Sequence, residues 1–133
     1  MRRECAAALT KEDTSMAMND RLLPGFGALL AAAGVAAQAY AAHAQGAELM
    51  RTAGLFLLIH GVAVIAITAS ARSAPRRLLD GGAIALAGGT ALFAADLAAR
   101  ALYERSLFPF AAPIGGSAMI LAWVALAGAF VSA

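Results

Sequence analysis

Three side chains in otherwise apolar surroundings have the chemistry for a site: His43, His60 and Asp96. Two imidazoles and a carboxylate can bind a transition metal or pass protons through a membrane. Neither histidine has a histidine or acid four residues away, so neither forms a ready-made site on one helix. His43 lies two positions after Ala41, about 200° around a helix, and so points away from the small residues on that face. We therefore expect no metal and no cofactor, with His43 at the membrane interface and His60 hydrogen-bonded to a neighbouring helix.

Asp96 is the most unusual of the three, because an acid within a membrane segment is costly and suggests a function by default. It follows Gly82 and Gly89 at intervals of seven residues, so it should share their helix face and point inward. Arg100 comes four residues later, a favourable spacing for an acid and a base on one helix. We interpret Asp96 and Arg100 as a structural pair. The alternative is that Asp96 and His60 serve a small transporter or proton relay.

These residues lie in four apolar stretches that fill most of the 133-residue chain after residue 21. The chain is 62% hydrophobic and 14% charged. Crossing the ~30 Å of hydrocarbon in a bilayer takes about 20 mostly apolar residues. Residues 1–21 are polar and are expected to lack regular structure. The rest, 22–133, is expected to form one membrane domain, with helices at about 22–44, 53–71, 78–99 and 110–131.

Small residues recur at helical spacing along the first three stretches, and such residues let helices approach closely in lipid. They are Gly27, Ala31, Gly34 and Ala41; Gly54, Gly61 and Thr68; and Gly82, Gly89 and Asp96. The connections Gln45–Thr52, Arg72–Arg77 and Arg100–Pro109 are short, which makes neighbouring helices antiparallel. The predicted fold is an all-α, four-helix antiparallel transmembrane bundle with both termini on one side.

Basic residues in short connections predict the orientation, because they favour the cytoplasmic side. One side carries Arg21, Arg72, Arg76 and Arg77, together with Arg2, Arg3 and Lys11; the other carries Arg51, Arg100 and Arg105. We therefore expect a multi-pass protein of the bacterial inner membrane with cytoplasmic termini. Met16 and Met18 are alternative starts that would remove part of this bias.

A signal peptide is a competing interpretation of the first stretch, since Ala42-His43-Ala44 fits an A-x-A cleavage site. Against it, the apolar run exceeds the 7–15 residues usual for the core of such signals. The net charge of +2 comes without a basic patch, so we expect lipid headgroups rather than nucleic acid as partners. Cys5 is the single cysteine of the chain, which excludes an internal disulfide.

The last apolar stretch opens with Pro113, Gly115 and Gly116. Proline suits a first helical turn, because the N–H that it lacks would be unbonded there. The two glycines should allow close packing. Trp123 lies too deep for an interfacial belt, so we expect it to pack within the bundle with its indole N–H bonded internally.

The segment from Pro113 to Trp123 resembles the signature of a small membrane-protein family that includes human transmembrane protein 256 and the bacterial YgdD proteins. Gly89-Thr-Ala-Leu-Phe93, Tyr40-Ala-Ala-His43 and Leu58-Ile-His60 are similar to further segments of that family, in the same order. Ala94-Ala95-Asp96 stands where the family has Ser-Gly-Ser, the first connection is shorter, and Leu57–Ile59 replaces polar residues. The resemblance implies a divergent member with the family's fold and membrane location, and it implies no reaction.

Nothing in the sequence pairs a nucleophile with a base, so we expect no enzyme. We expect a structural, accessory or assembly subunit of the membrane. Its partners would be the lipid bilayer and either another membrane protein or further copies of the chain.

Overall fold

Four helices account for most of the chain: α1 (Arg2–His43), α2 (Glu48–Ala69), α3 (Arg76–Tyr103) and α4 (Ala111–Val131). The computed structural model describes residues 2–45, 47–70 and 76–132, with side chains from Arg21 onward, and this part holds no strand. Each helix contains a segment long and apolar enough to cross a membrane; in α1 this segment is Arg21–His43. The all-α, four-helix membrane fold predicted from the sequence is confirmed.

α2 at its start and α3 at both ends extend beyond the apolar stretches that predicted them, whereas α4 agrees with its predicted stretch to within one residue. α2 begins at Glu48 rather than near residue 53, and α3 reaches from Arg76 to Tyr103 rather than from about 78 to 99. Helices can continue through the headgroup layers, where charged ends are solvated, whereas hydropathy marks only the hydrocarbon part. Arg72 and most of the predicted connection Arg72–Arg77 lie outside the described residues.

The N-terminal segment also differs from the expectation. Residues 1–21 were predicted to lack regular structure, but α1 begins at Arg2. Alanine, methionine, arginine and glutamate each occur more than once before Arg21, and all four favour helices. Low hydrophobicity excludes a buried core for this segment but does not exclude a helix.

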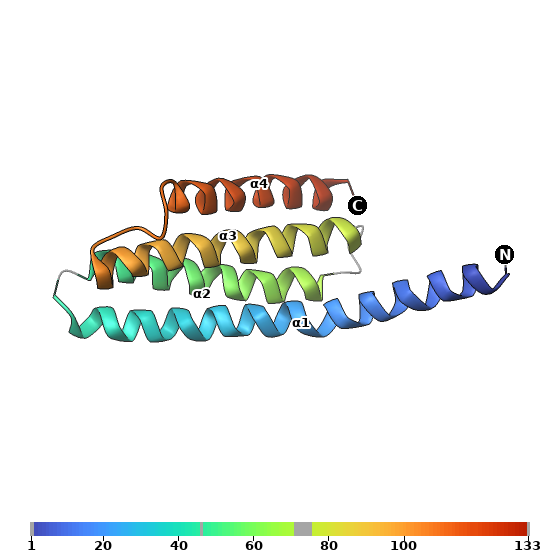
Figure 1. Cartoon of the computed structure of the whole chain (residues 1–133), viewed down its shortest axis with the longest axis horizontal. Helices are drawn as coiled ribbons and strands as arrows, with labels where there is room; N and C mark the ends of the chain where they lie inside the picture. The colour runs from blue at the N-terminus through green and yellow to red at the C-terminus, as the bar shows by residue number, and fades with distance from the viewer. Residues whose placement is uncertain (1, 46, 71–75, 133) are drawn as a thin grey trace.

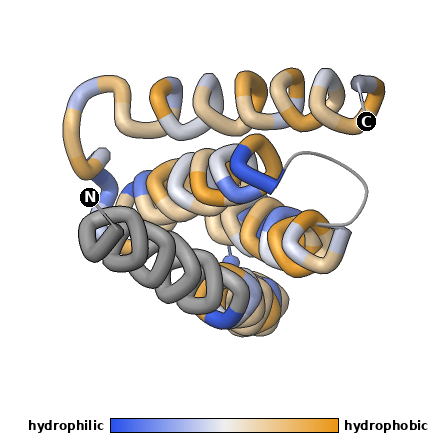
Figure 2. Tube along the Cα trace, turned by 90° about the vertical axis from the view of Figure 1, so that its right-hand side faces the viewer, coloured by the Kyte–Doolittle hydropathy of each residue, from blue (hydrophilic) through white to orange (hydrophobic). Residues whose placement is uncertain are grey.

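The helices are arranged in sequence order (Figure 1). α1 packs chiefly on α2, α2 on α3 and α3 on α4, with a smaller contact between α1 and α3. In the described residues, no Cα atom of α4 comes within 8 Å of α1 or α2. Figure 2 shows α4 lying on the outer side of α3 and crossing it at an angle. The fourth helix is therefore attached to the bundle mainly through α3.

Alanine supplies half of the buried apolar residues in the described part of the chain, together with a few larger aliphatic residues, and many large apolar side chains face outward. Ala83, Leu86 and Val64 are fully buried, whereas Leu29, Ile120 and Leu121 are 66–69% exposed. A water-soluble protein rarely leaves so much apolar surface open. In a bilayer the same surface meets acyl chains, which are as apolar as leucine.

Glycines on facing helices allow close backbone contacts in two helix pairs, α1 with α2 and α3 with α4. A Cβ atom on Gly27 would lie 2.7 Å from the Gly61 carbonyl oxygen, and one on Gly34 would lie 2.7 Å from that of Gly54. Between α3 and α4, a Cβ atom on Gly89 would lie 2.9 Å from the carbonyl oxygen of Gly115. Any larger residue at these positions must push the two backbones apart.

Candidate functional site

Asp96 is fully buried near the end of α3, and both of its carboxylate oxygens accept hydrogen bonds. Oδ2 accepts from Nε of Arg100 at 2.8 Å, one helical turn further along. Oδ1 accepts from the backbone N–H of Leu107, also at 2.8 Å. The predicted pair with Arg100 is present. The contact to Leu107 has no signal in the sequence, because it depends on how the connection after α3 folds back.

The connection held by Asp96 runs from Glu104 to Phe110 and contains strained backbone. Glu104 has φ 57° and Phe110 has φ 70°, both in the left-handed region that residues with a Cβ atom rarely adopt. Each such residue costs on the order of 1–2 kcal/mol. The short charge-assisted bond from Leu107 to Asp96 offsets part of this cost. Asp96 thus fixes both the end of α3 and the shape of the connection.

His60 lies close to the midpoint of α2 and is 8% exposed. Its Nδ1 donates to the carbonyl oxygen of Phe56 at 2.9 Å, which is within α2 and not across the bundle as the sequence predicted. The imidazole stacks on Phe56 with ring centroids 5.4 Å apart, and Phe56 in turn lies 4.8 Å from Phe93 of α3. Among the described residues, this bond within α2 is the one hydrogen bond that His60 makes.

Trp123 differs from the expectation. It is 42% exposed, and its indole N–H makes no hydrogen bond to any described residue. Its ring centroid lies 6.1 Å from that of His60. Because α4 is attached at the edge of the bundle, a residue in the middle of α4 can pack against α2 on one side and face lipid on the other.

The three residues considered first for a site do not form one cluster. His43 is exposed at the end of α1, His60 is buried in the middle of α2, and Asp96 is buried near the end of α3. Among the residues that the structure describes, no group of three or more His, Cys, Asp or Glu side chains could hold a metal ion. The polar groups of the bundle therefore act separately.

The glycines of the predicted packing motif divide into two kinds. Gly82, Gly89 and Gly115 lie in the interface between α3 and α4, where Gly82 faces the side chain of Leu126. Gly116 was expected to pack closely as well, but a Cβ atom there would meet nothing within 4 Å. One residue along a helix is a turn of about 100°, which takes position 116 out of the interface. Pro113 is exposed and is the third residue of α4, in its first turn as predicted.

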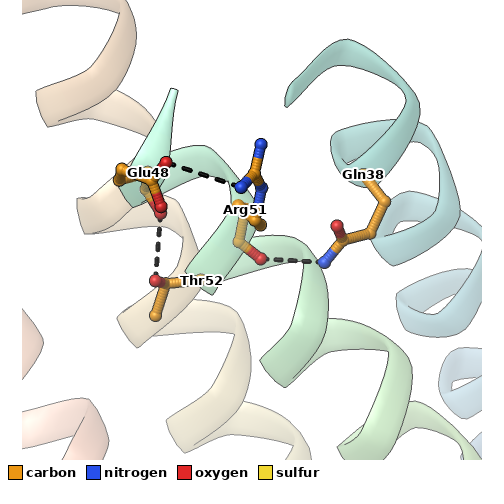
Figure 3. Close-up of polar contacts among 4 residues, drawn as sticks. All are labelled: Gln38, Glu48, Arg51 and Thr52. Atoms are coloured by element: carbon orange, nitrogen blue, oxygen red, sulfur yellow. Dashed lines mark hydrogen bonds and ion pairs between the residues drawn. The ribbon is translucent and has the colours of Figure 1, made fainter. Parts of the chain in front are cut away.

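Two polar contacts between helices were not predicted from the sequence. The amide of Gln38 in α1 donates to the backbone carbonyl of Arg51 in α2 at 2.9 Å, beside the exposed pair between Glu48 and Arg51 (Figure 3). Between α3 and α4, the buried hydroxyl of Thr90 lies 3.2 Å from Sδ of Met119 and 2.7 Å from the Leu86 carbonyl oxygen. Isolated Gln and Thr residues in apolar stretches are the only signal that could have indicated these contacts.

Comparison with known proteins identifies a family of unknown function. No curated protein and no solved structure matches the chain. A family described as "protein of unknown function", DUF423, matches residues 26–116, from the apolar part of α1 to the glycine pair at the start of α4. This match covers more than half of the chain, and the chain belongs to the DUF423 family.

Proposed function

We propose that this protein is a structural or accessory component of a bacterial inner membrane, and that it is not an enzyme. It would serve as a subunit or assembly factor that presents a rigid helical surface to other membrane components. The observation that carries this proposal is Asp96, whose two oxygens are both engaged inside the protein. An acid that binds a transported ion or proton needs a free lone pair, whereas one that holds a connection does not.

The glycine contacts support the same proposal. They keep α1 against α2 and α3 against α4 at backbone distance, which favours a single fixed arrangement over one that alternates. The exposed face of the bundle is then the part available to partners.

Purification of the tagged protein in mild detergent, with identification of proteins that copurify, tests the proposal. We expect one or a few membrane proteins at constant stoichiometry, or a defined oligomer of the chain itself. The matched control is Gly89→Leu, which should disrupt the α3–α4 contact and remove the copurifying proteins. A monomer that brings down nothing beyond background would contradict the proposal.

A proton relay is the second candidate, and one observation favours it. His60 is buried near the middle of α2, and its Nε2 has no hydrogen-bond partner among the described residues. Proton flux into liposomes that contain the purified protein would test this. Under the relay hypothesis, His60→Phe and Asp96→Asn both abolish flux while the protein remains folded. Under the structural proposal, there is no flux for either substitution to abolish.

We also propose that the finer resemblance is correct, so that the family is the one represented by human transmembrane protein 256 and the bacterial YgdD proteins. Supporting this, the matched region ends at the Pro-x-Gly-Gly segment that carries much of the resemblance. The cytoplasmic location of both termini is likewise part of the proposal and follows from the basic residues near them.

A further inference from the structure

A hollow of about 430 Å³ opens beside the end of α3 and the connection to α4. Its lining combines three polar side chains, Tyr103, Arg105 and Ser106, with the apolar Ala99 and Leu107. Two hydroxyls and a guanidinium supply several hydrogen-bond donors around one space. Such a set suits a phosphate group, whose oxygens accept bonds and whose charge a guanidinium neutralises.

Arg105 is the only cation in this lining. It is exposed, and it makes no ion pair or hydrogen bond with any residue that the structure describes. The nearby Arg100 is instead bound to Asp96, and Arg51 at the same end of the bundle is paired with Glu48. Glu104 is exposed next to Arg105 but does not line the hollow. The charge of Arg105 is therefore available to a ligand, although Glu104 weakens the local positive field.

With α3 across a bilayer, the hollow would lie at the depth of the lipid headgroups. The 28 residues of α3 span about 42 Å, which matches the ~40–45 Å of a bilayer including its headgroup layers. Two ion pairs of α3 mark the boundaries between hydrocarbon and headgroups: Arg76 with Asp80 at one end of the helix, and Asp96 with Arg100 at the other. Residues 104–110 follow the second boundary, and Figure 1 shows this connection beyond the N-terminal end of α4.

Exposed apolar side chains lie close in the sequence to the residues that line the hollow. Leu102 is 49% exposed, Phe108 43% and Phe110 73%, and each is within three residues of a lining residue. Aromatic and apolar groups at this depth pack against the upper part of acyl chains. A phospholipid offers a phosphate group to the hydrogen-bond donors and acyl chains to the apolar side chains. Free phosphate offers only the phosphate group.

The hollow keeps its shape because the connection is tied down. The Asp96–Leu107 bond holds this irregular segment in place against the cost of its two left-handed residues, Glu104 and Phe110. An ordered segment loses less conformational entropy when it binds a ligand than a flexible one does. We propose that this connection binds the phosphate group of an anionic phospholipid, with Arg105 as the main contact and the hydroxyls of Tyr103 and Ser106 as further donors. The inference requires only that α3 crosses a bilayer, and it does not depend on the accessory role.

Native mass spectrometry of the purified full chain, titrated with phosphatidylglycerol, tests the inference. We expect Arg105→Gln to raise the dissociation constant of the first bound lipid about fivefold, the effect typical of one basic residue near a lipid surface. The control is Arg51→Gln, which removes the same charge at the same end of the bundle but from a residue paired with Glu48. It should leave lipid affinity unchanged. Glu104→Gln should strengthen binding, because it removes the neighbouring negative charge.

Two results would overturn the inference. The first is an unchanged affinity in Arg105→Gln, or an equal loss in both arginine variants, since either means that no specific contact exists. The second is displacement of the lipid by inorganic phosphate, which would identify the hollow as a site for the free anion. A melting temperature equal to that of the wild type confirms that each variant is folded, which is expected because both arginines are exposed.

Discussion

At the scale of single residues, Asp96 joins two parts of the chain that are eleven positions apart through one carboxylate. Its side chain is fully buried, and its partners are the guanidinium of Arg100, a side chain that is 43% exposed, and one backbone N–H. A buried acid is tolerated when every lone pair directed into the protein has a donor. This residue therefore acts as a structural link, even though its position in a membrane segment first suggests transport.

Replacing Asp96 by asparagine should loosen this link. The amide keeps one acceptor oxygen but loses the charge, so it can retain only one of the two bonds at full strength. We expect a loss of about 1–3 kcal/mol in the free energy of unfolding. We also expect faster hydrogen exchange at the Leu107 amide, followed by mass spectrometry or NMR in detergent.

The control for this substitution is Glu48→Gln. It removes a carboxylate from a pair that is 55% and 78% exposed, with atoms 3.5 Å apart. Exposed pairs of this kind contribute about 0–1 kcal/mol. If both variants lose the same stability, or if Leu107 stays protected in Asp96→Asn, the structural role of Asp96 is wrong.

At the scale of the helices, adjacent glycines in α3 have opposite environments. A Cβ atom on Gly89 would lie 2.9 Å from the carbonyl oxygen of Gly115 and 3.0 Å from Cβ of Ala118, whereas one on Gly88 meets nothing within 4 Å. The sequence alone does not show which of these two adjacent glycines lies in the interface. The structure places Gly89 against α4 and Gly88 away from it.

Alanine at each of these positions should change stability with opposite signs. Gly89→Ala forces the two helix backbones apart and should cost about 1–3 kcal/mol. Gly88→Ala adds a methyl group in open space and removes a flexible residue from a helix, so it should be neutral or stabilise by about 0.5–1 kcal/mol. Thermal unfolding of both variants in the same detergent measures the difference. Equal effects would show that α3 does not present this face to α4.

At the scale of the whole molecule, the sequence predicts the fold far better than the polar contacts. Four apolar runs of bilayer length leave few alternatives to a helical bundle, and the seven-residue spacing of Gly54 and Gly61 indicates their shared face. The bond from Leu107 to Asp96 could not be predicted in the same way, because an irregular connection has no periodicity. The exposure of Trp123 follows from the peripheral place of α4, which depends on packing between helices and not on α4 itself.

The orientation of the molecule in the membrane is the last expectation that can be tested directly. In Figure 1 the α1–α2 and α3–α4 connections lie at one end of the bundle, and the C-terminus lies at the other. Arg76 and Arg77 lie at the end of the bundle that holds the C-terminus, where Arg21 begins the apolar segment of α1. Basic residues that flank membrane segments favour the cytoplasmic side. We therefore expect Gln45 to face the periplasm and Ser132 to face the cytoplasm.

Single cysteines placed in a Cys5→Ser background measure this orientation. With a membrane-impermeant maleimide on bacterial spheroplasts, Gln45→Cys should react at once and Ser132→Cys only after the membrane is opened. Both positions are exposed, so reaction of both after permeabilisation controls for burial. The reverse order would place the termini in the periplasm. The hollow beside Arg105 would then lie in the cytoplasmic leaflet. Because anionic lipids also occur there, the expected lipid affinity would be the same in this orientation.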